Sequence, residues 1–203
     1  MIHTLQSHGR ARAATRLTEK TADNLRQQLT PTSQRGASIY GTLLLAGAMA
    51  AARAGDRRAT HDYLDEADGY ARRIGHDANH LWTAFGPTNV AIHRVATSVA
   101  FDDIDDAHDH TSGIDTSRLP VERRVRYAFD LARVSAARRE IDQAVTGMLA
   151  AERLAPEQVH HHVMGRQIVA DLRRTSGGKH HPELTRLAER IHEGDARTVG
   201  LAR

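Results

Sequence analysis

The sequence predicts an all-α protein built from antiparallel helix pairs. Its alanine-rich composition favours helix, and aromatic residues make up only 4% of the chain. No alternating run of β-branched and aromatic residues is bounded by turn residues, so strand signals are almost absent. Apolar residues recur instead at helical spacing between short turns. The 203 residues are enough for one domain, or two small ones, with a sizeable core.

The helices expected from this periodicity lie in one helical domain over residues 10–193, with tails at 1–9 and 194–203. They span residues 10–29, 36–54, 57–74, 87–101, 104–113, 120–138, 141–154, 164–174 and 183–193. A proline ends the first of them at Thr30-Pro31. Gly55-Asp56 makes a tight turn before the third, whose apolar residues share one face. Those residues are Tyr63, Leu64, Ala67, Tyr70, Ala71 and Ile74.

The later helices are delimited in the same way. Pro87 suits the first turn of the helix over residues 87–101. Asp102-Asp103 and Arg139-Glu140 are expected turns, and Pro120 opens the helix between them. Pro156 closes the helix over residues 141–154.

The helix–turn–helix pairs fit the tetratricopeptide pattern, which places small residues where two helices cross closely. Residues 125–156 fit best, at Leu131, Ala132, Ala144, Met148, Ala151 and Pro156. Other matches are Leu44, Ala48, Leu64 and Ala67 around Gly55, and Val95 and Ala107 around Asp102. The three turns at 55, 102 and 139 are separated by 47 and 37 residues rather than a strict repeat. An α-solenoid of stacked pairs and a generic helical bundle both remain open.

Charge and cysteine usage exclude several classes of protein. With no cysteine, the chain has no disulfide framework, thiolate metal site or cysteine nucleophile. The net charge of +3 is modest, with a basic segment at residues 1–36 and an acidic one at 76–117. The uncharged run at residues 36–52 is too short to span a bilayer, and the N-terminus lacks a signal-peptide pattern. We therefore expect a cytoplasmic protein without a membrane partner.

Four ordered segments carry a family resemblance. They are residues 38–57, beginning SIYGTLLLA; residues 77–93, DANHLWTAFGPTNVAIH; residues 114–124, ending RLPVERR; and residues 150–157, AAERLAPE. Together they resemble the C-terminal tetratricopeptide region of actinobacterial XRE-type, lambda-repressor-like transcriptional regulators. The resemblance covers residues from about 10 to about 192.

This resemblance implies an α-solenoid that serves as a sensor or dimerisation module. Members of the family carry an N-terminal helix-turn-helix that binds DNA, and no such motif precedes the resemblance here. The sequence also has Asp102 and Arg139 where the family has turn glycines. The implied role is a regulatory module that binds a peptide, a small effector or a partner protein, such as an intact helix-turn-helix paralogue or a second copy. Direct DNA binding through the basic N-terminus is an alternative.

Two groups of residues are candidates for the binding groove. The first is the connector before residue 87 with the helix after it, where aromatic and polar side chains suit an effector. Its members are Asn79, His80, Trp82, Phe85, Asn89 and His93. The alternative is a packed loop in which Trp82 plugs the seam between helix pairs. The second group comprises Thr42, Met49, Arg53, Arg126, Asp130 and Arg133, on the first helices of two pairs. Solvated charge is the alternative for its arginines.

Catalytic and metal sites are not expected, and neither is a cofactor. Asp102, Asp103 and Asp106 match the DDxxD pattern of magnesium-dependent diphosphate enzymes, but the second metal motif is missing. A charged helix start, where acids suit the helix dipole, is the preferred explanation of these residues. The 14 histidines include His160-His161-His162 and His180-His181, which lack a metal-binding pattern with carboxylates.

Overall fold

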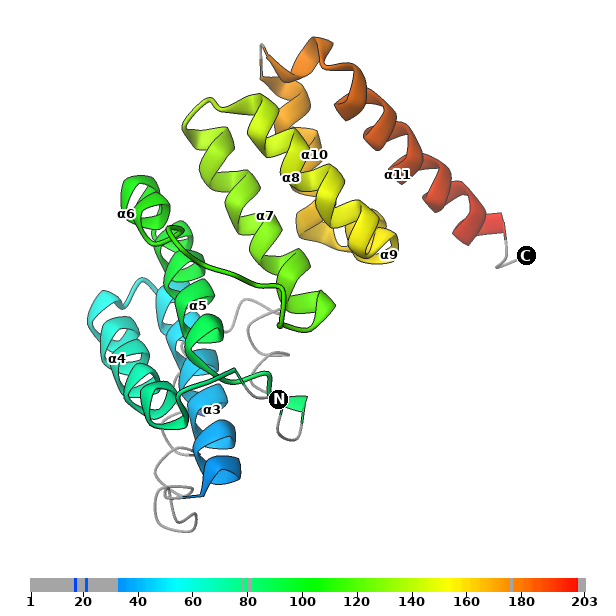
Figure 1. Ribbon diagram of the computed structural model, residues 1–203. Helices are drawn as coiled ribbons and strands as arrows, with labels where there is room; N and C mark the ends of the chain where they lie inside the picture. The colour runs from blue at the N-terminus through cyan, green and yellow to red at the C-terminus, as the bar shows by residue number, and fades with distance from the viewer. Residues whose placement is uncertain are drawn as a thin grey trace. The chain divides into compact units, whose positions relative to one another are not determined.

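The computed structural model describes residues 33–77, 79, 82–175 and 177–200, together with Leu17 and Thr21, with side chains up to Ile191. Over these residues the chain forms nine α-helices, packed largely as sequential antiparallel pairs, and one short 3-10 helix (Figure 1). It divides into two compact units, Met1–Leu119 and Pro120–Arg203. The predicted all-α class is confirmed. The expected tail at 1–9 and helix at 10–29 lie outside the described residues, apart from Leu17 and Thr21.

The first unit is built on one long helix pair. Its described helices are α3 (Gln34–Arg53), α4 (Arg57–Ile74), α5 (Pro87–Ala100) and α6 (Ile104–Asp109). Helices α3 and α4 lie antiparallel and make the most extensive contact of the unit, while α5 packs on both of them (Figure 1). Helix α6 folds back on α5. This arrangement brings the connector between α4 and α5 against the α3–α4 pair.

Local sequence explains where these helices begin and end. The hydroxyl of Ser33 accepts the Gly36 N–H at 3.0 Å and caps α3, and Asp56 caps α4 through the Ala59 N–H at 3.0 Å. Gly75 ends α4 with a φ of 74°, in the left-handed region that glycine adopts without a steric cost. Pro87 opens α5, as predicted from the sequence.

The core of the first unit lies between α3 and α4 and extends to the connector. Its buried members are Ala37, Tyr40, Leu44, Leu45, Ala48, Leu64, Ala67, Ala71, Ile74, Phe85 and Val90. The ring of Phe85 lies directly over Gly41, where an added methyl group would overlap it. A glycine in the middle of α3 therefore admits the connector's aromatic ring into the core.

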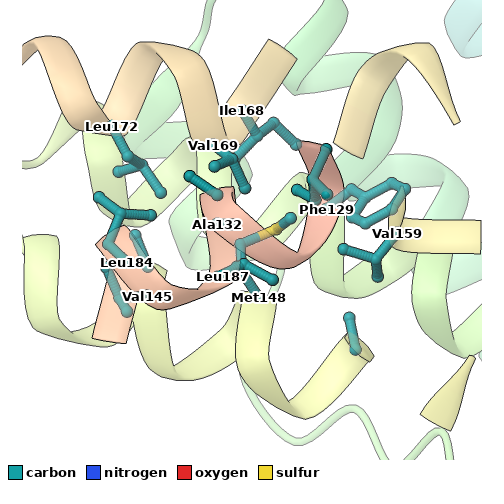
Figure 2. Close-up of a cluster of buried hydrophobic side chains, with 14 of the residues drawn as sticks. Phe129, Ala132, Val145, Met148, Val159, Ile168, Val169, Leu172, Leu184 and Leu187 are labelled. Carbon is teal, nitrogen blue, oxygen red and sulfur yellow. The ribbon is translucent and has the colours of Figure 1, made fainter. Parts of the chain in front are cut away.

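The second unit has its own core. Its described helices are α7 (Val121–Ala137), α8 (Ile141–Leu154), α9 (Pro156–His161), α10 (Val163–Arg174), the 3-10 helix η2 (Gly178–His180) and α11 (Pro182–Gly200). Helices α7 and α8 form its main antiparallel pair. Figure 2 shows the side chains that meet between the helices, among them Phe129, Met148, Leu172 and Leu187. All four are almost fully buried, so this unit also excludes water from its interior.

The structure confirms most predicted helix positions and corrects three. Helix α6 ends at Asp109 rather than at residue 113, and α11 continues to Gly200 beyond the expected end at 193. The sequence analysis missed α9, because Pro156 ends α8 and also occupies the first turn of a new helix. The residues matched to the repeat pattern on α3, α4, α5, α6, α7 and α8 are buried, except for the half-buried Leu131. No helix within the described ranges is long and apolar enough to span a membrane.

Candidate functional site

Three contacts hold the connector between α4 and α5 in place, one of them within the connector. Asp77 Oδ1 accepts the Thr88 N–H at 2.9 Å, and Asn79 Oδ1 accepts the Ala84 N–H at 3.0 Å. Phe85 is fully buried against Gly41 on α3. Two hydrogen bonds from backbone N–H groups to side-chain oxygens, and one buried ring, thus hold the segment in place on both sides of Trp82.

Trp82 projects into solvent from this fixed connector. Its side chain is 90% exposed, and its backbone φ is 61°, while Ala84 has a φ of 51°. Left-handed backbone costs a residue with a side chain about 1–2 kcal/mol. The alternative in which Trp82 plugs a seam between helix pairs is therefore wrong, because Phe85 occupies the buried position. The connector displays its largest aromatic ring instead of burying it.

Asn89 and His93 lie one turn apart on α5, as expected, but only one of them reaches the surface. Asn89 is 1% exposed, and neither polar atom of its side chain has a hydrogen-bond partner among the described residues. His93 is half-buried, with Nδ1 2.7 Å from the Asn89 carbonyl oxygen. Phe85 and Asn89 are therefore buried, while Trp82 and Asn79 are exposed on the connector. His80 lies outside the described residues.

The candidate face on α3 contains Thr42, Met49 and Arg53. Their spacing of seven and four residues places them along one side of the helix. Thr42 donates its hydroxyl to the Ser38 carbonyl at 2.8 Å, Met49 is half-buried, and Arg53 is exposed. The face therefore presents a charged end and a partly covered middle to solvent.

The candidate face on α7 contains Arg126, Asp130 and Arg133. Asp130 is buried, whereas Arg133 is exposed. Arg126 Nη1 lies 3.1 Å from His162 Nε2. Partial burial lowers the pKa of His162, and the positive charge of Arg126 lowers it further. Burial, with a smaller contribution from the Asp130 carboxylate, raises the pKa of Tyr127 to about 12.

The acidic segment before α6 forms contacts within the first unit. Asp103 forms a two-point ion pair with Arg57, whose guanidinium also lies 4.4 Å above the Phe101 ring. Asp106 accepts the Ser98 hydroxyl at 2.5 Å, and Asp102 sits at the turn with a φ of 61°. No three metal-binding side chains converge anywhere in the part of the chain that the structure describes. The DDxxD pattern thus consists of a turn residue and two acids that bind neighbouring helices.

A partly buried ion cluster in the second unit had no counterpart in the sequence analysis. Glu152 on α8 accepts two hydrogen bonds from Arg190 on α11, at 2.7 and 2.5 Å, and one contact of 2.8 Å from His160 on α9. Burial opposes ionisation of Glu152, but these hydrogen bonds and charges outweigh it and lower the pKa of the carboxyl. The sequence does carry one indication of this cluster, because Glu152 is a charged residue at a helix position where the pattern favours an apolar one.

A cavity of about 400 Å³ opens beside α10 in the same unit. Its lining comes from α10, α11 and the last residue of α9. The lining residues are His161, Val163, Arg166, Gln167, Val169, Ala170, Arg173, Ala188 and Ile191. Sequence reasoning missed this cavity because its two main walls come from helices with no shared motif.

Comparison of the chain with protein-family models, with curated proteins and with solved structures finds no match.

Proposed function

We propose that the chain is a regulatory binding module rather than an enzyme, and that its helix pairs form a tetratricopeptide-like solenoid. The sequential antiparallel pairs support this architecture, as do the buried small residues at the positions the repeat pattern requires. The resemblance of residues 10–192 to the C-terminal region of XRE-type regulators supports the regulatory role. The partner is a peptide or protein, with an intact helix-turn-helix relative or a second copy of the chain as specific candidates.

The exposed indole of Trp82 is the observation that carries the proposal. A large aromatic ring on a fixed segment loses little conformational entropy on binding, and tryptophan is enriched among the residues that dominate interface energetics. Strained backbone at Trp82 and Ala84 persists because the hydrogen bonds at Asn79 and Asp77 hold the segment around it. Partner binding removes this ring from water, and the burial of its apolar surface contributes favourable free energy to binding.

The helix faces on α3 and α7 supply the polar part of recognition. Arg53 and Arg133 present guanidinium groups that match carboxylates through paired hydrogen bonds. Met49 provides an adaptable apolar contact one turn from Arg53 on α3. Binding along these faces favours one arrangement of the helix pairs over another, and a partner chain transmits that shift.

The first experiment is native mass spectrometry of the protein purified gently from its own cells. We expect a stoichiometric peptide or protein adduct that is lost in Trp82→Ala. Leu154→Ala is the matched control, because Leu154 is also an exposed large hydrophobic residue but lies at the end of α8. An adduct that survives Trp82→Ala unchanged would contradict the role of Trp82, and the absence of any adduct would contradict the binding module.

Reconstitution then tests the contact directly. Trp82 is the single tryptophan of the chain, so its fluorescence reports on this one position. We expect the emission to shift to shorter wavelength when the isolated partner is added, because the indole leaves water. Trp82→Ala should weaken binding by about 2 kcal/mol or more, near thirtyfold in Kd.

A further inference from the structure

We propose that the cavity beside α10 binds a small anionic amphiphile, specifically a monocarboxylate with a saturated chain. Its volume of about 400 Å³ lies in the range of small-ligand sites, at roughly 300–1,000 Å³. The site shares no residue with the connector or with the candidate faces on α3 and α7. The proposal is therefore independent of the function proposed above, and either can fail alone.

The floor of the cavity is apolar. Val169 from α10 and Ala188 and Ile191 from α11 are each 5% exposed or less, and they line the cavity from its buried side. Val163 stands at the edge with 80% of its surface exposed, although it begins a helix of an otherwise well-packed unit. A saturated chain that lies on this floor would remove apolar surface from water.

The rim of the cavity is basic. His161, Arg166 and Arg173 all line it, and no described lining residue is acidic. The nearby Asp171 on α10 is already bound by Gln167, at 2.9 Å, and by Arg174. An apolar floor with a basic rim complements a molecule that has an apolar chain and a negative head. It does not complement a cation or a nucleotide base, because the described lining residues include no carboxylate and no large aromatic ring.

Arg173 is the residue assigned to the carboxylate. It is exposed on the last turn of α10, where its guanidinium is free to form paired hydrogen bonds with the two carboxylate oxygens. Arg166 lies seven residues earlier, roughly 10 Å along the helix, and borders the other end of the cavity. The chain of the ligand therefore runs along α10 between the two arginines, over Val169 and Ala170.

The test uses decanoate as the probe and methyl NMR of the full chain as the readout. We expect decanoate to shift the methyl signals of Val169 and Ile191 and to leave those of Val90, in the core of the first unit, unchanged. Octanoate should bind about fifteenfold more weakly, because each buried methylene contributes about fourfold in affinity. Decyltrimethylammonium, with the same chain and the opposite charge, should not produce these shifts.

Two variants and their controls complete the test. Arg173→Gln should weaken decanoate binding at least about tenfold, whereas Arg153→Gln, an exposed arginine on α8, should not. Ala170 is half-buried in the cavity lining, so Ala170→Phe should fill the cavity and abolish the shifts. Ala150→Phe, at a half-buried position on α8, is its control. Equal shifts from the cationic probe, or binding that is indifferent to Arg173, would overturn the proposal. Occupation of the cavity by an acidic peptide or a second copy, with no response to decanoate, would also overturn it.

Discussion

Two residues with side chains hold left-handed backbone at turns where a glycine would fit without strain. Asp102 has a φ of 61° between α5 and α6, and Arg139 has a φ of 64° between α7 and α8. Aspartate tolerates this conformation better than arginine, because its short side chain can hydrogen-bond locally. The corresponding turn between α3 and α4 has Gly55 at a φ of 78°. The strain is therefore greater at Arg139 than at Asp102.

We expect Arg139→Gly to stabilise the protein by about 0.5–1 kcal/mol, because glycine adopts this backbone without a clash. For a chain of this size the melting temperature should rise by about 1–3 °C, measured by thermal denaturation followed by circular dichroism. Gly55→Ala is the matched control, since the added methyl group meets no atom within 4 Å and changes only the backbone energy. It should lower the melting temperature. An unchanged or lower value for Arg139→Gly would show that its side chain contributes more than the strain costs.

At the scale of single elements, sequence reasoning located helices well where apolar spacing and turn residues agree. Helices α4 and α8 span the residues that the pattern indicates. It missed α9 because a proline can follow the end of one helix and also occupy the first turn of the next. It left the exposure of Trp82 open, since the burial of Phe85 in its place depends on the space above Gly41. That space is a property of packing between elements.

The ion cluster of Glu152 joins three elements of the second unit and predicts a pH dependence. The folded-state pKa of Glu152 lies below its ordinary value of 4.5, so its ionisation stabilises the fold. This contribution is fully present above about pH 5 and is lost as the pH falls through the lower folded-state pKa. The free energy of unfolding should therefore decline in acid.

Glu152→Gln should remove this part of the acid dependence. We expect a loss of about 1–3 kcal/mol at neutral pH, because the carboxylate charge that strengthens the hydrogen bonds from Arg190 is removed, and a shallower decline below pH 5. Urea denaturation at several pH values measures both effects. Glu157→Gln, at an exposed position on α9, is the control. The same decline in acid for Glu152→Gln and for the unmodified protein would contradict the assignment.

At the scale of the whole molecule, each of the two compact units has a core of its own. A domain unfolds cooperatively when its residues share one core. Two separate cores therefore predict that damage to one unit leaves the protection of the other largely intact.

Leu44→Ala and Met148→Ala test this prediction as a reciprocal pair. Both side chains are fully buried, one in each core, and each truncation should cost about 2–5 kcal/mol. Hydrogen exchange followed by mass spectrometry should show loss of protection in α3–α5 for the first variant and in α7–α8 for the second. If either variant exposed both units equally, the chain would behave as one cooperative unit.

The ring of Phe85 fills the space that a side chain at position 41 would need, and this has a consequence for evolution as well as for packing. A lineage that gains a side chain at position 41 keeps its connector only if the residue at position 85 becomes smaller. The two positions should therefore be inherited as a pair. Among descendants of a common ancestor, alanine at 41 should appear together with a residue smaller than phenylalanine at 85.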